Sequence, residues 1–284
     1  MNDTQLQARS EAQAEATMAR EEAPWPVRRP LCFAHRGARA YAPENTLLAF
    51  AVACDLGADG IECDVQRSRD GRLIIIHDGL VDRTTDGTGA VAEMSFAELS
   101  TLDAGRFPRI PQRIPTLEET LDLARERKCL LNLEIKGETA EESLGTARAC
   151  EPYLRSLDDA FRRRILVSSF DHSALAALKE RLPWLRVGAL FGKEWRGRDI
   201  VAAARKLGAD AMHPSVALVT RDLIVRAQES GLRVHVWTAN APHAIRQLIA
   251  WGVDGIFTDY PERVLIARTL HDTDIGYPFP PAAR

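Results

Sequence analysis

The chain has 284 residues, of which 45% are hydrophobic and 27% charged, and its formal net charge is -3 at pH 7. This ordinary globular composition suits one large domain with a substantial core. Lys and Arg are not in excess, so we expect neither nucleic-acid binding nor stable membrane association, whereas a small anionic substrate remains compatible.

The five cysteines are odd in number and include no C-x-x-C pair, which indicates neither a disulfide framework nor a zinc ribbon. The first residues lack the apolar core of a signal peptide, and no stretch approaches the roughly 18 apolar residues of a membrane span. We therefore expect a cytoplasmic protein; oligomeric state is left open.

Residues 1–29 are rich in Ala, Glu, Gln and Arg, so we expect a disordered or frayed tail there, and a second tail at 272–284. Between them, residues 30–271 form one predicted domain. Strand-like runs alternate with helical patterns from Leu31 onward, which is typical of a parallel sheet covered by helices, the α/β class.

Nine short apolar runs are candidate strands, at residues 31–35, 60–65, 73–77, 130–135, 165–170, 186–191, 211–213, 233–238 and 255–258. An eight-stranded barrel has no place for a ninth strand, so one candidate is either not a strand or lies outside the barrel. The segment between Asp64 and His77 is too short for a helical crossover and contains the turn signal Asp70-Gly71. The alternation must therefore break here, through a hairpin or an extended crossover.

Helix boundaries support this alternation. Thr116 and Glu119 have the spacing of a capping box. Three helical patterns end in a Gly-x-Asp phrase, at residues 57–59, 208–210 and 252–254, which predicts a C-cap glycine before the next strand. This repeat favours a barrel over two unrelated domains.

Two acidic residues share one face of a predicted strand. Residues two apart in a strand point the same way, so Glu62 and Asp64 lie together while Cys63 faces the opposite side as inert core. Glu134 repeats the pattern in another strand. Three inward carboxylates repel unless basic partners or a cation balance them, and oxygen ligands suit Mg²⁺ or Ca²⁺. Salt bridges are an equally weighted alternative, with Arg36, Lys136 or Arg72 as partners.

Two histidines, His35 and His77, close predicted strands, and the carboxyl ends of barrel strands are where active sites form. Imidazoles exchange protons near neutral pH, so one could activate a nucleophile and the other protonate a leaving group. Arg36 and Lys136 could neutralise a phosphate. Gly37, next to Arg36, indicates a tight turn at which backbone approaches a ligand.

The phrase at residues 43–46 leads into a helix, which we expect Asn45 or Thr46 to cap, while Glu44 orients a residue of the site. Aromatic side chains, Trp237 above all, are candidates for a substrate-pocket wall, together with Phe191 and Tyr41.

These segments, in this order, resemble the glycerophosphodiester phosphodiesterase family. The likeness spans roughly residues 31 to 265 and rests on an ordered set of phrases, at residues 34–37, 43–46, 57–65, 77–85, 114–119, 132–136, 168–170, 237–240 and 252–259. Residues 66–71 depart from the family's usual turn, and Ala239 replaces a common Val; neither affects a proposed catalytic group.

The resemblance implies a (β/α)₈ barrel of the phospholipase C-like phosphodiesterase type, with a small insertion after the third strand. It implies divalent-metal-dependent hydrolysis of glycerophosphodiesters to sn-glycerol 3-phosphate and an alcohol. By position, the metal ligands would be Glu62, Asp64 and Glu134, the general acid and base His35 and His77, and the phosphate-binding residues Arg36 and Lys136. We expect His35 to be the base and His77 the acid. The nucleophile is either water or the glycerol 2-hydroxyl.

Two alternatives remain open on the same fold. A lysophospholipase D-type phosphodiesterase would need an apolar trough beside the site, and no amphipathic basic stretch is evident. A non-catalytic barrel that binds a phosphorylated ligand would not need both histidines and all three acids.

Overall fold

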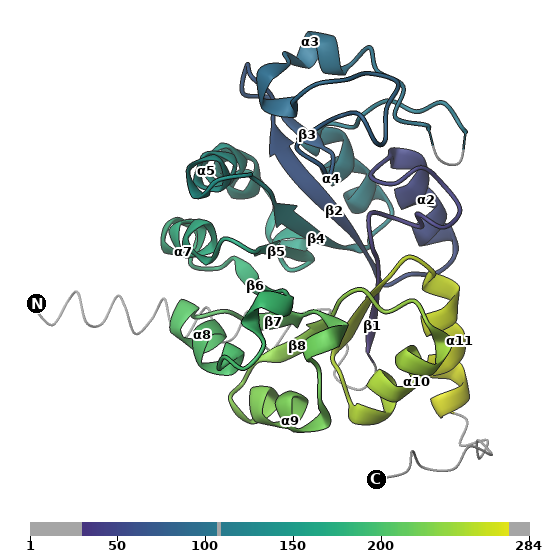
Figure 1. Cartoon of the computed structure of the whole chain (residues 1–284), viewed down its shortest axis with the longest axis vertical. Coiled ribbons are helices and arrows are strands. Elements are labelled where there is room, and N and C mark those ends of the chain that lie inside the picture. The colour runs from purple at the N-terminus through teal and green to yellow at the C-terminus, as the bar shows by residue number, and fades with distance from the viewer. Residues whose placement is uncertain (1–29, 107–108, 273–284) are drawn as a thin grey trace, which may run out of the picture.

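The computed structural model describes residues 30–106 and 109–272 and shows a barrel ringed by helices (Figure 1). Eight parallel strands pair in the order β1-β2-β4-β5-β6-β7-β8-β9, and β9 pairs with β1 to close the barrel. Their bounds are β1 Leu31–Ala34, β2 Gly60–Arg67, β4 Leu130–Ile135, β5 Ile165–Ser169, β6 Arg186–Phe191, β7 Ala211–Pro214, β8 Arg233–Val236 and β9 Gly255–Thr258. The predicted tails lie outside the described residues, apart from Asp272.

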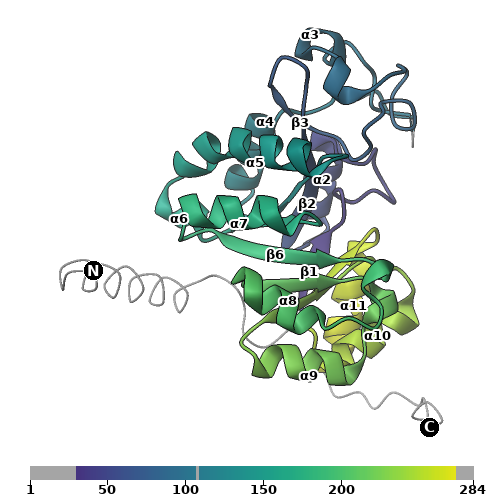
Figure 2. The ribbon, with the colours of Figure 1, turned by 60° about the vertical axis from the view of Figure 1, so that its left-hand side comes forward.

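Helices cover the outside of the barrel in both ribbon views (Figures 1 and 2). They are α2 Leu47–Asp55, α4 Leu117–Glu126, α5 Ala140–Arg155, α6 Asp159–Arg162, α7 His172–Arg181, α8 Ile200–Leu207, α9 Arg221–Glu229, α10 Pro242–Trp251 and α11 Pro261–Asp272. Short 3₁₀ turns follow β6 and β7, η2 Lys193–Trp195 and η3 Val216–Leu218. None of the helices in the described ranges is both long and apolar enough to cross a membrane.

The ninth candidate strand is peripheral to the barrel. β3 (Leu73–Ile75) pairs antiparallel with the end of β2, so the chain makes the hairpin that the short connection required. The predicted insertion follows β3 and holds η1 (Val91–Glu93) and α3 (Phe96–Leu99), which stand beyond the barrel at the top of Figure 2. A small core of its own, which includes Ile76, Val91 and Leu99, stabilises this insertion.

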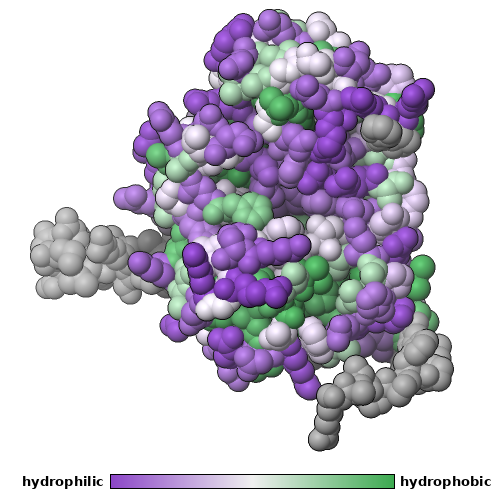
Figure 3. All heavy atoms as spheres, viewed as in Figure 1, coloured by the Kyte–Doolittle hydropathy of each residue, from purple (hydrophilic) through white to green (hydrophobic). Residues whose placement is uncertain are grey.

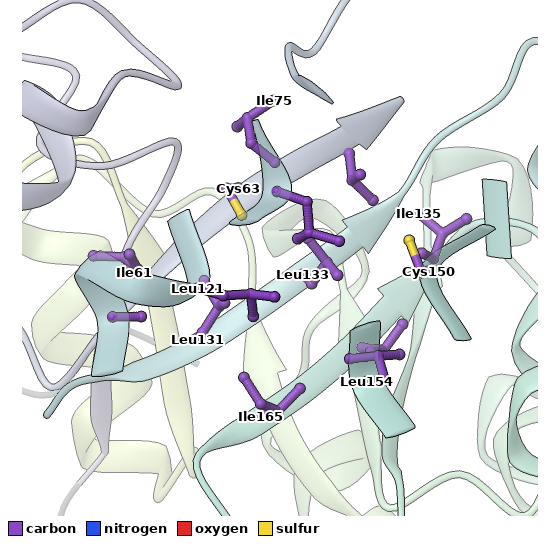
Figure 4. Close-up of a cluster of buried hydrophobic side chains, with 14 of the residues drawn as sticks. Ile61, Cys63, Ile75, Leu121, Leu131, Leu133, Ile135, Cys150, Leu154 and Ile165 are labelled. Carbon is purple, nitrogen blue, oxygen red and sulfur yellow. The ribbon is translucent and has the colours of Figure 1, made fainter. Parts of the chain in front are cut away.

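Strand parity separates the core from the site. Ile61 and Cys63 of β2 point to the helix side and are fully buried with Leu121 of α4 (Figure 4). Glu62 and Asp64 therefore point into the barrel, as the two-residue period predicted. The capping box of Thr116 and Glu119 is present at the start of α4.

The three Gly-x-Asp phrases form three similar connections between a helix and the next strand. Gly57, Gly208 and Gly252 have positive φ angles of 90°, 71° and 80°, which confirms the predicted glycine helix ends. The aspartates have a role that the sequence did not reveal. A carboxylate oxygen of each accepts a backbone N–H from the preceding strand of the barrel; the pairs are Asp59 with Cys32 at 2.7 Å, Asp210 with Val187 at 3.0 Å and Asp254 with Val234 at 2.9 Å.

Candidate active site

A cavity of about 100 Å³ opens at the carboxyl ends of the strands. Its ionisable lining residues are His35, Arg36, Glu62, His77 and Glu134. Its apolar and aromatic lining residues are Phe170, Leu190, Trp237 and Phe257, and Asn132, Ser168, His213 and Thr238 complete the lining. On the face in Figure 3, hydrophilic residues gather in the upper half and a hydrophobic patch lies below.

The three predicted acids converge inside the barrel. Glu62, Asp64 and Glu134 each offer a carboxylate oxygen within 4.8 Å of the others. Among the described residues, Glu62 Oε1 and Asp64 Oδ1 are buried and accept no hydrogen bond. Unsatisfied buried carboxylate oxygens at this spacing fit a hard divalent cation, so the cluster could hold one.

The same cluster is electrostatically strained. Burial, together with the charges of Asp64 and Glu134, raises the pKa of Glu62 well above its usual value. Burial also acts to raise the pKa of Asp64, but the Lys136 and Arg36 cations outweigh it and hold that pKa below the usual value. Both salt-bridge partners expected from the sequence are therefore present, since Lys136 Nζ lies 3.0 Å from Glu134 Oε1 and Arg36 Nε lies 3.5 Å from Asp64 Oδ2. Lys136 Nζ also lies 3.7 Å from Asp64 Oδ1, which is beyond hydrogen-bond distance, and Glu62 Oε1 has no donor in the described residues, so salt bridges and a cation are compatible here.

His35 is oriented by a carboxylate from the far end of the chain. Its Nδ1 lies 2.7 Å from Asp259 Oδ1, and the other oxygen of Asp259 accepts a hydrogen bond from Asn240 Nδ2 at 2.7 Å. This contact leaves Nε2 of His35 for a ligand. Burial lowers the pKa of His35, and the hydrogen bond to Asp259 opposes that shift.

His77 has a similar support and an added cation. Its Nδ1 lies 2.6 Å from Asp78 Oδ1, and Arg83 Nε donates to the other oxygen of Asp78 at 2.5 Å. Its Nε2 lies 3.3 Å from Lys136 Nζ. Burial lowers the pKa of His77, the charges of Arg36 and Lys136 add to that effect, and Asp64 opposes it.

Arg36 sits on a tight turn, as Gly37 indicated. Gly37 has a φ of 78°, and a Cβ on it would lie 2.7 Å from the carbonyl carbon of Ala49. The turn brings the backbone N–H of Arg36 within 2.7 Å of Glu62 Oε2. Glu44 accepts a hydrogen bond from the Arg36 guanidinium at 2.8 Å, so it lies where the sequence analysis expected it.

The cap of α2 is Thr46, whose hydroxyl accepts from the backbone N–H of Ala49. Asn45 does not cap the helix. Its backbone has a positive φ of 55°, and its Nδ2 donates to Asp64 Oδ2 at 2.8 Å, so it orients one of the acids. The capping expectation for residues 45–46 therefore holds for the threonine alone.

Trp237 lines the cavity, and its Nε1 donates to the carbonyl oxygen of His213 at 2.7 Å. Phe191 and Tyr41 are not among the described lining residues. Phe191 is buried against Trp195, and Tyr41 is 45% exposed and packs edge-on against Tyr260.

The sequence analysis assigned no role to several residues that the barrel brings to the site. Asp259 and Asn240 hold His35, and Arg83 joins Asp78 to Glu44. Arg39 Nη2 lies 3.1 Å from Glu44 Oε2. Asp259 follows the last strand directly, so its position at a strand end was a usable signal.

Fold and site together define the class of protein: a (β/α)₈-barrel enzyme with two carboxylate-held imidazoles beside an acidic cluster. The sequence model of the Glycerophosphoryl diester phosphodiesterase family matches residues 35–263. The chain belongs to this family and is a phosphoric diester hydrolase, a glycerophosphodiester phosphodiesterase.

The relatives align with this chain along nearly their whole length. A glycerophosphodiester phosphodiesterase of Caldanaerobacter subterraneus subsp. tengcongensis is 36% identical over 83% of this chain and 96% of its own. One of Bacillus altitudinis is 34% identical over 83% of this chain and 97% of its own. An Oleispira antarctica phosphodiesterase, solved in complex with the product sn-glycerol-3-phosphate, is 29% identical with a TM-score of 0.77, over 84% of this chain and 96% of its own.

Proposed function

We propose that this enzyme uses a divalent cation and two histidines to hydrolyse glycerophosphodiesters to sn-glycerol 3-phosphate and an alcohol. The observation that carries the proposal is the arrangement of His35 and His77. Both imidazoles line the cavity that holds Glu62 and Glu134, and a carboxylate contacts each one through Nδ1. The Oleispira relative with bound product supports the glycerol 3-phosphate half of the substrate.

The cation would be held by Glu62, Asp64 and Glu134, and Mg²⁺ or Ca²⁺ suits these oxygen ligands. When bound, it supplies positive charge that stabilises the phosphoryl oxygens as negative charge gathers on them. Arg36 and Lys136 add to this charge, because both cations lie against the acid cluster at the cavity.

We assign His35 as the general base. The hydrogen bond from Nδ1 to Asp259 leaves Nε2 to take the proton of the nucleophile, which is water or the glycerol 2-hydroxyl. The carboxylate then stabilises the imidazolium that forms, in the way that a triad aspartate does. The P–O bond to the alcohol breaks as the new P–O bond forms.

We assign His77 as the general acid. Asp78 at Nδ1 stabilises the protonated ring, and the Lys136 cation, 3.3 Å from Nε2, lowers the cost of giving the proton up when substrate takes the place of that contact. That proton goes to the oxygen of the departing alcohol. If the glycerol 2-hydroxyl attacks first, the same two histidines exchange roles when water opens the cyclic phosphate.

The assignment is tested with two leaving groups. His35→Ala and His77→Ala should each reduce kcat on glycerophosphocholine by about 10²-fold or more. With a glycerophosphodiester that carries p-nitrophenol, which leaves without a proton, His77→Ala should recover most of its activity and His35→Ala should not. Recovery by His35→Ala instead would reverse the roles, and near-normal turnover by both variants on both substrates would refute the mechanism.

A second candidate substrate class is lysophospholipids, cleaved by the same chemistry. It is favoured by apolar surface at the strand-end face, where Phe170 is 45% exposed and Val216 38% exposed. Comparison of lysophosphatidylcholine with glycerophosphocholine decides between the two, and we expect the smaller diester to be hydrolysed faster.

A further inference from the structure

Two histidines occupy the interior of the barrel, where branched aliphatic side chains normally fill the space. His213 of β7 and His235 of β8 are 0% exposed, and His213 Nε2 lies 3.1 Å from His235 Nδ1. Neighbouring glycines make room for the rings. A Cβ on Gly188 would lie 2.4 Å from His213 Cε1, and one on Gly255 would lie 2.8 Å from His235 Cδ2.

The second ring nitrogen of His213 has no partner within the described part of the protein. His213 lines the same cavity as His35, and its Nδ1 is buried with no hydrogen-bond partner among the described residues. An unpaired buried polar atom costs about 1–3 kcal/mol, so a partner from outside the protein is expected.

Asn132 of β4 presents the same signature on that cavity. Its Nδ2 donates to Ser168 Oγ at 2.9 Å, which fixes the amide and leaves Oδ1 as a buried acceptor without a partner in the described part of the chain. Asn132 precedes Glu134 by two residues on the inward face of β4, and the strand register pairs it with Glu62 of β2. Both unpaired groups therefore belong to residues that line the same cavity as Arg36.

The missing ligand group must donate to Asn132 Oδ1 and must be able to either donate to or accept from His213 Nδ1. Asn132 Oδ1 can only accept, and the neutral imidazole of His213 offers a donor or an acceptor at Nδ1 according to the tautomer it shares with His235. Burial lowers the pKa of His213 to about 3, so the ring carries no charge for an anion. A hydroxyl meets these demands, and the apolar faces of Trp237 and Phe257 suit the carbon atoms that carry it.

We propose that His213 and Asn132 bind the terminal hydroxyl of the glycerol moiety and are specificity-determining residues of this enzyme. The inference rests on the proposed function, since it names the part of the substrate that these two lining residues of the active-site cavity recognise. A site built to hydrogen-bond a hydroxyl discriminates strongly against analogues that lack it, because its own polar atoms are then left unpaired.

The test compares two diesters of choline, glycerophosphocholine and its 2-hydroxypropyl analogue, which keeps the hydroxyl nearest the phosphate and lacks the terminal one. The quantity measured is the ratio of their kcat/KM values, in which damage common to both substrates cancels. We expect the wild-type enzyme to favour glycerophosphocholine by about 10²-fold or more.

A matched pair of variants isolates the Nδ1 atom. His213→Gln keeps a polar atom near the Nε2 position, facing His235, but none at the Nδ1 position, whereas His213→Asn does the reverse. We expect Gln to reduce the ratio below about 10 and Asn to keep it within a few-fold of wild type. Asn132→Leu, similar in shape, should reduce the ratio as His213→Gln does, and His243→Gln on the exposed surface of α10 is the control.

The outcomes separate this inference from the function beneath it. A wild-type ratio near 1, a wild-type ratio retained in His213→Gln, or equal losses in His213→Gln and His213→Asn would overturn the hydroxyl assignment alone. If the wild-type enzyme with Mg²⁺ or Ca²⁺ hydrolyses neither diester, the proposed function fails and this inference fails with it.

Discussion

Asp259→Asn tests how the proposed base is oriented. The carboxylate accepts from His35 Nδ1 and from Asn240 Nδ2, both at 2.7 Å, so both of its oxygens act as acceptors. An asparagine has one acceptor and one NH₂ group. If its oxygen faces His35, its NH₂ opposes the NH₂ of Asn240; if it flips, its NH₂ forces His35 to accept at Nδ1 and to carry the proton on Nε2.

The flipped arrangement disables a base that must accept at Nε2, and the other arrangement removes the carboxylate charge that stabilises the imidazolium. The loss of a general base reduces rate by about 10²–10⁴-fold, and an imidazole in the wrong tautomer behaves as a lost base. We therefore expect kcat to fall by about 10²–10³-fold, or about 3–4 kcal/mol, with a small change in KM. This loss of transition-state stabilisation should be larger, in kcal/mol, than any decrease in the free energy of unfolding.

The pH profile gives a second readout. Burial lowers the pKa of His35, and the hydrogen bond to Asp259 raises it, so removal of the carboxylate charge should lower it further. The acid limb of kcat/KM, which in wild type should lie below pH 6.5, should therefore move to lower pH in Asp259→Asn.

The assay is the coupled release of glycerol 3-phosphate from pH 4.5 to 8, with Asp122→Asn on the exposed surface as the matched control. An Asp259→Asn enzyme with wild-type kcat and an unmoved acid limb would refute the orienting role.

Three further predictions follow from the same geometry. Glu62→Gln removes one oxygen ligand from the acid cluster, so the increase in Tm that Mg²⁺ or Ca²⁺ gives the wild-type protein should be lost, as thermal melts with and without cation would show; an equal increase in the variant would count against the site. Gly37→Ala places a Cβ 2.7 Å from the backbone of Ala49 at a φ of 78°, so urea unfolding should show a loss of about 2 kcal/mol or more, and an unchanged midpoint would contradict the tight turn. His213 has a pKa of about 3 when folded and about 6.5 when unfolded, so between these pH values the unfolded state binds a proton that the folded state does not; wild type should lose about 2 kcal/mol more than His213→Gln between pH 7 and pH 5, and equal losses in urea titrations would refute burial of a neutral ring.

The alternation of side chains along a strand was the most informative sequence signal for the site. The two-residue period alone separated Glu62 and Asp64 from Cys63, because burial on one face leaves a strand no choice of register. The peripheral β3 was predictable for a similar reason, since the connection between β2 and β3 is too short to hold a helix.

The sequence did not predict which side chains come into contact when the barrel closes. Asp259 lies 224 residues from His35, and pattern alone does not pair two strand ends at that separation. The role of Asn45 was missed for another reason, since a residue just before a helix fits a cap equally well and only its positive φ shows that it faces Asp64. His213 closed the predicted strand at residues 211–213, as His35 and His77 closed theirs, but the sequence analysis gave it no role, and the glycine that accommodates its ring comes from another strand.

The measurement that tests the central claim most directly is release of glycerol 3-phosphate from glycerophosphocholine by the wild-type enzyme, before and after EDTA treatment and after Mg²⁺ or Ca²⁺ is restored. We predict product that is abolished by EDTA and recovered with the cation, and no recovery in Glu62→Gln at the same cation concentration. Undiminished product in EDTA would contradict the role assigned to the three carboxylates, and absence of product under every condition would contradict the proposed activity.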